Sequence, residues 1–129
     1  MKLEQQVCSL ELAKRLEELG VKQDSLFWWL DGERPELRYL YNFTGQEKKK
    51  YSAYNVAELG EILPDNYFTR KHFGSGTKRW HWQVYHGYEE TSVNGELIAS
   101  DMYTSDTEAD ARAKMLVYLL ENNLLTTYE

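Results

Sequence analysis

The closing part of the chain constrains the fold most, because residues 109–122 carry the pattern of an amphipathic helix. Apolar side chains recur there at helical spacing and make one wide stripe, formed by Ala109, Ala113, Met115, Leu116, Leu119 and Leu120. Ser105 and Glu108 predict a capping box in front of this helix. We therefore expect the helix to lie buried, with its apolar stripe against the rest of the domain.

Two further helices are predicted upstream. Ser9 suits the N-cap of the first, because its hydroxyl can accept a backbone N–H of the first turn, and Gly20 supplies the left-handed residue that ends it. Asn55 and Glu58 form a capping box for a shorter helix that runs through Leu63 and stops at a proline.

Alternating and apolar segments predict strands at 26–30, 37–43, 80–93 and 96–103, whereas residues 44–50 and 67–78 are predicted as loops. The Asn94–Gly95 pair indicates a tight hairpin turn between the last two strands. Residues 26–30 are apolar on both faces of the predicted strand. Either helices cover both faces of the sheet, or one face remains uncovered and is available for self-association. The order α-β-β-α-β-β-α predicts a single α+β domain over residues 1–129, with three helices packed on a largely antiparallel sheet of about four strands.

The composition indicates the cellular compartment in which we expect the protein. The 129 residues carry a net charge of -6 and one cysteine, Cys8, which suits a reducing compartment and a buried structural role. No apolar run approaches the roughly 20 residues of a membrane-spanning helix, and the first residues lack a secretory signal. We expect a soluble, cytoplasmic protein that does not enter the membrane.

Three segments carry a resemblance to known proteins. They are Ser9–Leu16 through Gln23 with Ser25, Phe27 and Trp29, then Ala53–Tyr54 with Val56–Pro64, and finally Ala109–Asn122 with Leu124. Together they resemble a family of small bacteriophage and prophage proteins over about 40% of the chain, nearly all of it helix and core pattern. The resemblance implies an accessory protein in the cytoplasm of a bacterial host. The family has no established activity, so it implies no catalytic or binding residue.

The sequence gives little support for catalysis, a metal or a cofactor. His81 and His86 point to opposite faces of a predicted strand, which disfavours a shared metal ion. No motif places a nucleophile beside a base. The segment 74–78, Gly-Ser-Gly-Thr-Lys, lacks the spacing of a phosphate-binding loop. We expect a protein that binds and does not catalyse, with no metal and no cofactor.

Basic and aromatic residues alternate in the middle of the chain. Residues 44–82 carry seven basic and four acidic side chains, a net charge of +3. Cationic side chains bind phosphates, and aromatic rings stack on bases. If the loops of this segment converge, they are predicted to bind a nucleotide or single-stranded nucleic acid. The alternative is that the rings belong to the core and the lysines keep loops solvated. The candidate ligand-binding residues are Lys49, Lys50, Tyr67, Arg70, Lys71, His72, Lys78, Arg79, Trp80 and Trp82.

The final third is acidic instead. Residues 83–129 carry two basic and nine acidic side chains, a net charge of -7, with Glu89, Glu90, Glu96, Asp101, Asp106, Glu108 and Asp110 near one another in sequence. Such a surface suits a basic protein partner. The first hypothesis is therefore an accessory factor that binds a protein, including a role as an inhibitor of host defence, and the alternative is the nucleotide or single-stranded nucleic-acid binder.

Overall fold

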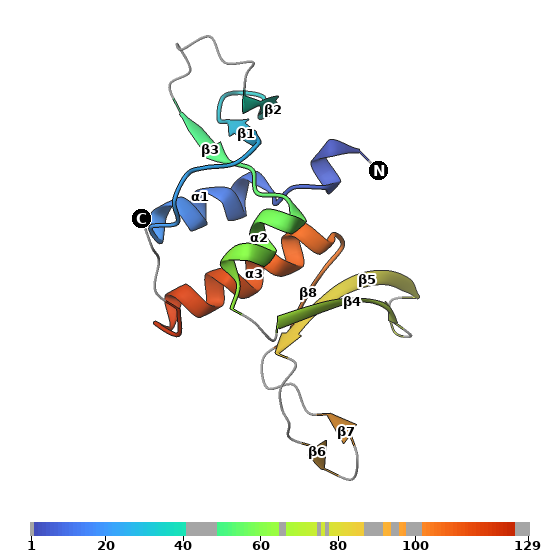
Figure 1. Ribbon diagram of the computed structural model, residues 1–129. Helices are drawn as coiled ribbons and strands as arrows, with labels where there is room; N and C mark the ends of the chain where they lie inside the picture. Colours follow the sequence, from blue (N-terminus) through green and yellow to red (C-terminus); the bar gives the residue numbers. More distant parts are fainter. Residues whose placement is uncertain are drawn as a thin grey trace.

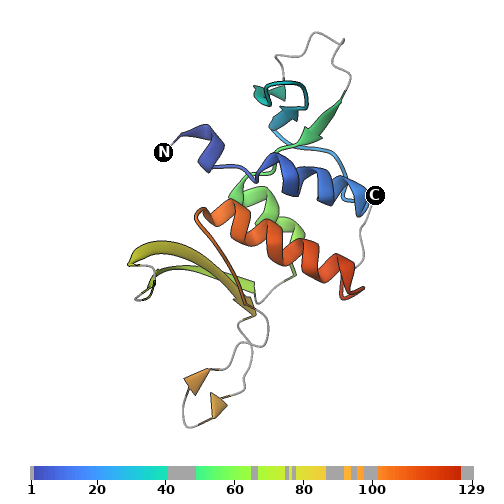
Figure 2. The same cartoon turned by 180° about the vertical axis from the view of Figure 1, so that it is seen from behind.

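The computed structural model describes residues 2–40, 49–64, 67–74, 76, 78–86, 92–93, 96–97 and 102–125. Within these residues the chain has an α+β fold with three α-helices and two three-stranded antiparallel sheets. The helices lie between the two sheets in both views of the molecule (Figures 1 and 2). The fold class and the positions of the helices agree with the sequence prediction, while the strands are shorter and more numerous.

Helix α3, Glu108–Glu121, lies at the centre of this arrangement. It packs against α1 and α2 and also against the sheet that contains β5 and β8. Because neighbours cover it on several sides, Ala111 is buried in addition to the whole of the predicted stripe. The predicted capping box is wrong, however. The N-cap is Thr107, whose hydroxyl accepts the N–H of Asp110.

Helix α1, Leu10–Glu18, begins and ends as the sequence predicts. The Ser9 hydroxyl accepts the N–H of Leu12 at 3.3 Å, and Gly20 has a φ of 91°. The N–H of Val21 then bonds to the carbonyl of Leu16, which satisfies one of the last carbonyls of the helix. Helix α2, Val56–Ile62, likewise begins with the predicted capping box of Asn55 and Glu58.

The first sheet has the order β2-β1-β3, with β1 at Phe27–Leu30, β2 at Glu36–Tyr39 and β3 at Lys50–Ser52. The predicted hairpin of β1 and β2 is confirmed, but β2 ends at Tyr39. Strand β3 was not predicted, and it begins at Lys50, the last residue of the segment predicted as a loop. Both tryptophans of β1 are buried, as expected for a strand apolar on both faces: Trp29 donates to the carbonyl of Cys8, and the Lys50 ammonium lies 5.2 Å from the Trp28 ring. The side chain of Trp28 therefore offers little exposed surface for the self-association that the sequence predicts.

The second sheet has the order β4-β5-β8, with β4 at Tyr67–Gly74, β5 at Arg79–His86 and β8 at Met102–Ser105. The loop predicted over residues 67–78 is therefore wrong for 67–74, which form a strand of eight residues. Strand β5 ends at His86, earlier than predicted. Two short strands, β6 at Ser92–Val93 and β7 at Glu96–Leu97, pair next to the predicted turn, whose Asn94 and Gly95 lie outside the described residues.

Within the described part of the chain, no helix is long and apolar enough to cross a bilayer.

Candidate functional site

The β4–β5 hairpin brings together eight of the ten candidate residues (Figure 1). Tyr67, Arg70, Lys71 and His72 belong to β4, Lys78 lies in the turn, and Arg79, Trp80 and Trp82 belong to β5. Lys49 and Lys50 do not join them, because they lie in or beside β3 of the other sheet, on the far side of the helices. We refer below to residues 67–74 and 78–86 as the basic hairpin.

The two faces of this hairpin differ in what covers them. Directly paired residues of antiparallel strands lie on the same face, and the pair of Thr69 and Val84 faces α3, where Val84 is fully buried. Further along that face, towards the turn, stand Lys71, Phe73, Trp80 and Trp82. The outer face carries Phe68, Arg70, His72, Arg79 and His81. No described helix covers the outer face (Figure 1).

Near the turn the hairpin projects past α3 and exposes large aromatic rings. Phe73 and Trp80 are 45% and 58% exposed, and their rings meet edge to face with centroids 5.3 Å apart. The Lys71 ammonium lies 6.0 Å from the centroid of the Trp80 ring. An exposed tryptophan beside a cation offers a flat stacking surface next to a positive charge.

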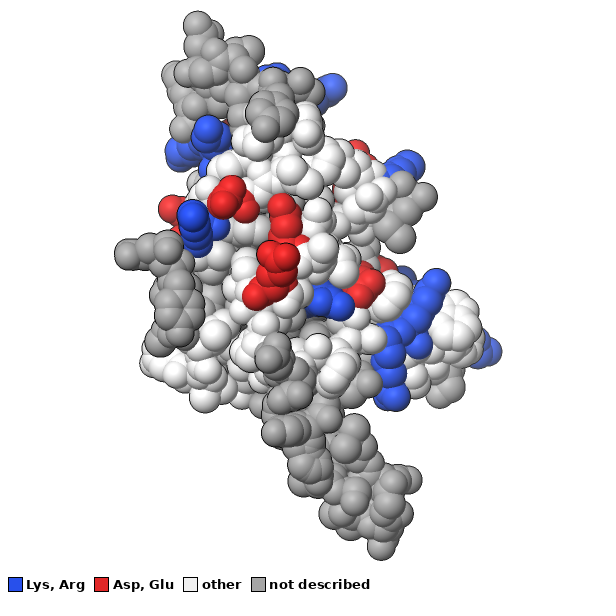
Figure 3. Space-filling model, in the orientation of Figure 1, with Lys and Arg blue, Asp and Glu red and all other residues white. Residues whose placement is uncertain are grey.

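The outer face holds cations in fixed positions. Arg70 Nε donates to Gln83 Oε1 of the neighbouring strand at 2.8 Å, which holds the guanidinium against β5. Arg79 pairs with Asp106 at 3.2 Å, and both side chains are about two-thirds exposed or more. An ion pair so open to water contributes little to stability, so a phosphate can replace the carboxylate at small cost. Figure 3 shows lysine and arginine side chains gathered over the hairpin.

Two histidines in the half of the hairpin near its turn face each other. His72 and His81 are paired across the strands with ring centroids 5.3 Å apart. Among the described residues, no group of three His, Cys, Asp or Glu side chains stands close enough to hold a metal ion. This histidine pair was not predicted, because residues 67–74 carry no alternation and are predicted as a loop. A sequence signal for it does exist. Two segments of eight residues flank a bend that contains glycine, and this arrangement is compatible with a hairpin that would pair the two histidines.

A cavity of about 550 Å³ adjoins the inner face of the hairpin near its turn. One side is formed by Lys71, Trp80 and Trp82, and the other by the N-terminal ends of α2 and α3 and by Gln5 and Gln6. Its volume is typical of ligand pockets. The combination of indole rings with amide, hydroxyl and carboxylate groups suits a flat ring that carries hydrogen-bonding edges.

The turn of the hairpin is not a phosphate-binding loop. Gly74 and Lys78 are joined by a hydrogen bond from the Lys78 N–H to the Gly74 carbonyl, and Lys78 adopts a φ of 57°. The segment connects two strands, whereas a phosphate-binding loop connects a strand to a helix. Lys78 therefore contributes an exposed charge at the tip.

The described part of the acidic final third is occupied by internal contacts. Glu108 accepts hydrogen bonds from Thr69 at 2.5 Å and Arg112 at 3.2 Å, while Asp110 accepts the N–H of Ser9 at 2.7 Å. Burial raises the pKa of Asp110 above its ordinary value. Glu89, Glu90 and Asp101, and the side chain of Glu96, lie outside the described residues. Glu108 and Asp110 are thus engaged in contacts within the fold.

Cys8 is not a candidate nucleophile. Its side chain is fully buried, and burial raises the pKa of the thiol to about 12. The reactive thiolate is therefore scarce at neutral pH.

Comparisons of this chain with protein-family models, with curated proteins and with solved structures find no match.

Proposed function

We propose that this protein binds single-stranded nucleic acid through the basic hairpin. The observation that supports this most is that four exposed cations and three exposed rings share one hairpin. Arg70, Arg79 and Phe68 belong to the outer face, Lys71, Phe73 and Trp80 to the inner face, and Lys78 to the turn between the strands. The setting that we propose, following the family resemblance, is that of a bacteriophage or prophage accessory protein in the bacterial cytoplasm.

The length and openness of the surface favour a strand over a free nucleotide. Each strand of the hairpin has eight residues, which at about 3.3 Å per residue makes a surface of about 25 Å. Such a length accommodates several consecutive nucleotides. Stacking on Trp80 requires a base whose face is accessible, and bases within a duplex are stacked on one another. A single strand satisfies both conditions.

The overall charge of the chain is compatible with this proposal. The net charge of -6 opposes binding of a polyanion over the whole surface, so contact has to be local. We expect modest, salt-dependent affinity, in the micromolar range at about 0.1 M salt.

Fluorescence anisotropy with fluorescein-labelled oligothymidylate and oligouridylate tests this proposal. Trp80→Ala removes the stacking surface and should weaken binding about tenfold, since stacking on one aromatic side chain contributes roughly 1–3 kcal/mol. Trp80 is 58% exposed, so the variant should fold normally, which circular dichroism checks. Lys71→Ala should also weaken binding.

The matched control is Lys49→Ala, which removes the same charge from an exposed lysine beside β3. It should leave the affinity unchanged. The proposal is wrong if the wild-type protein binds neither oligonucleotide at low salt, or if Lys49→Ala weakens binding as much as Lys71→Ala does.

A further inference from the structure

A second cavity, of about 590 Å³, lies away from the basic hairpin, and no residue of the hairpin lines it. Its walls come from the segment before β1, the end of β2, helix α2 and the end of α3. They are mostly apolar, with Val21, Leu26, Leu40, Ile62, Leu120 and Leu125. Leu26 lines this cavity and is itself 46% exposed. We call this cavity the acid-rimmed groove.

Carboxylates line the same cavity as the apolar side chains. Asp24, Glu58 and Glu61 line the groove together with one cation, Lys22. Figure 3 shows acidic side chains grouped at the centre of the view, where Figure 1 places α2. The groove therefore combines apolar walls with an excess of negative charge.

The three carboxylates have different roles. Glu58 is engaged in the fold, because its two oxygens accept the N–H groups of Asn55 at 2.9 Å and of Leu26 at 3.1 Å. Asp24 and Glu61 are exposed, and neither makes an ion pair with another described residue. These two charges are available to a ligand.

The end of α3 adds to the negative potential. Leu120 and Leu125 bring the C-terminal end of this 14-residue helix to the groove, and the C-terminal end of a helix carries a partial negative charge. A polyanion is repelled by this arrangement. A neutral apolar ligand leaves the carboxylates unused.

We propose that the acid-rimmed groove binds a protein segment in which large apolar side chains are flanked by lysine or arginine. The apolar side chains enter between Leu26 and Ile62, and the cations meet Asp24 and Glu61. This partner surface is separate from the basic hairpin and does not depend on nucleic-acid binding. Amphipathic helices commonly bind apolar grooves in this way, with anchors at i, i+3, i+4 and i+7.

A designed peptide pair tests the charge complementarity directly. The probe is a fluorescein-labelled peptide of about a dozen residues with leucine on one helical face and lysine on the other. Its partner carries glutamate in place of every lysine. The lysine peptide should bind the wild-type protein in an anisotropy titration, and the glutamate peptide should not. In a ¹⁵N-labelled sample the amide resonances of Leu26, Ile62 and Leu120 should shift on addition of the lysine peptide.

The variants Asp24→Lys and Glu61→Lys should each weaken the lysine peptide about tenfold, since they place like charges across the contact. The control is Glu33→Lys, the same change at an exposed site in the turn at the other end of the β1–β2 hairpin. It should leave binding unchanged. The proposal is overturned if the lysine peptide fails to bind, if the glutamate peptide binds equally well, or if Glu33→Lys weakens binding as much as Glu61→Lys. All three positions are exposed, so folding should persist, and circular dichroism verifies it.

Discussion

At the scale of single residues, Gly60 of α2 shows how a missing side chain makes room for an arginine of α3. Arg112 of α3 donates from Nη2 to Thr69 of β4 at 3.1 Å and to Glu108 at 3.2 Å. A Cβ atom added at Gly60 of α2 would lie 2.5 Å from Nη1 of the same guanidinium. The glycine therefore makes room for a side chain that links α3 to β4.

Gly60→Ala should lower the free energy of unfolding by about 1 kcal/mol, although alanine usually stabilises a helix relative to glycine by about that amount. The reason is that the guanidinium has to leave its hydrogen-bond partners. In an Arg112→Ala background the same change should be stabilising, because the obstacle is gone. Urea unfolding of the four proteins measures this reversal of sign. Gly32→Ala is the control, since a Cβ at Gly32 meets nothing within 4 Å. A stabilising Gly60→Ala in the wild-type background contradicts this account.

Cys8 predicts how stability depends on alkaline pH. Burial raises the pKa of its thiol to about 12 from an unfolded value near 9. Between these values the unfolded chain has lost the proton that the folded chain keeps, so the free energy of unfolding should fall as pH rises, by up to about 1.4 kcal/mol per pH unit. Burial also raises the pKa of Tyr54, which adds to the loss of stability at alkaline pH.

Chemical denaturation at a series of pH values above 9 should show this loss, and Cys8→Ala should reduce its slope. The native thiol should also resist alkylation by iodoacetamide at pH 8 and react once the protein is unfolded. Rapid alkylation of the folded protein would rule out the buried thiol.

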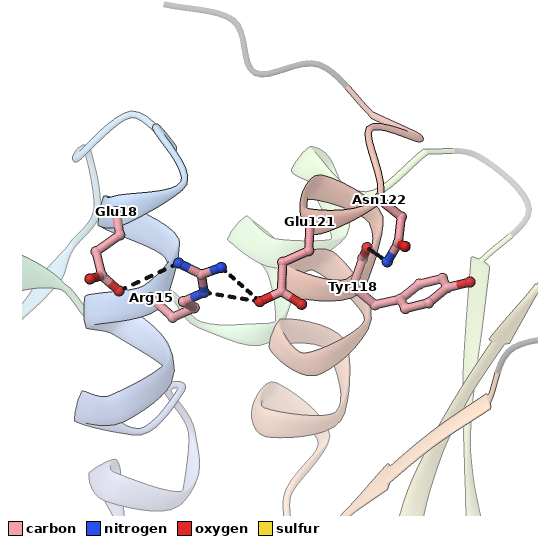
Figure 4. A network of polar contacts seen from close by, with 5 residues as sticks. All are labelled: Arg15, Glu18, Tyr118, Glu121 and Asn122. Atoms are coloured by element: carbon pink, nitrogen blue, oxygen red, sulfur yellow. Dashed lines mark hydrogen bonds and ion pairs between the residues drawn. The ribbon is translucent and has the colours of Figure 1, made fainter.

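At the scale of elements, α1 and α3 are joined at their C-terminal ends by an ion pair (Figure 4). Arg15 donates from both Nε and Nη2 to one oxygen of Glu121, at 3.0 and 2.8 Å, and lies 3.7 Å from Glu18. Next to Glu121, the side chain of Asn122 donates to the carbonyl of Tyr118 and closes the last turn of α3. Both side chains of this ion pair are partly exposed to water.

A double-mutant cycle with Arg15→Ala and Glu121→Ala should give a coupling of at most about 1 kcal/mol, because Arg15 and Glu121 are each 42% exposed. The coupling should shrink further at high salt. Thermal or urea unfolding of the four proteins provides the measurement. A coupling of several kcal/mol, insensitive to salt, would mean that the pair is shielded from water.

Helix ends could be predicted from the sequence, whereas one strand could not. Ser9, Gly20 and the Asn55–Glu58 box act locally, through side chains within a few residues, so their pattern is visible in the sequence. Strand β4 depends on its pairing with β5, and its mixture of basic and aromatic residues shows no alternation of its own. The N-cap of α3 was misplaced by two residues because Ser105, Asp106 and Thr107 are all capable of capping, and Asp110 fits Thr107 as Glu108 fits Ser105.

At the scale of the whole molecule, charge is divided between two separate surfaces. The sequence predicted a cluster of basic and aromatic residues because most of them lie close together along the chain, but it did not predict the hairpin that they form, since residues 67–78 were predicted as a loop. It could not predict that Lys49 and Lys50 belong to the other sheet, since that depends on the pairing of β3 with β1. The acid-rimmed groove was not predicted either, because its walls come from four distant segments. Long-range pairing therefore decides which charges act together.

The salt dependence of oligonucleotide binding shows whether the cations of the basic hairpin contact phosphates. For single strands the logarithm of the affinity falls with the logarithm of the salt concentration, with a slope of about -0.7 for each phosphate neutralised. The four exposed cations are divided between the two faces and the turn of the basic hairpin, so two to four phosphate contacts are expected and the wild-type slope should lie between roughly -1.4 and -2.8. Lys78→Gln should reduce the magnitude by about 0.7, and Lys49→Gln should not change it. Binding that is independent of salt, or an equal change for both variants, would contradict the assignment of nucleic-acid binding to this hairpin.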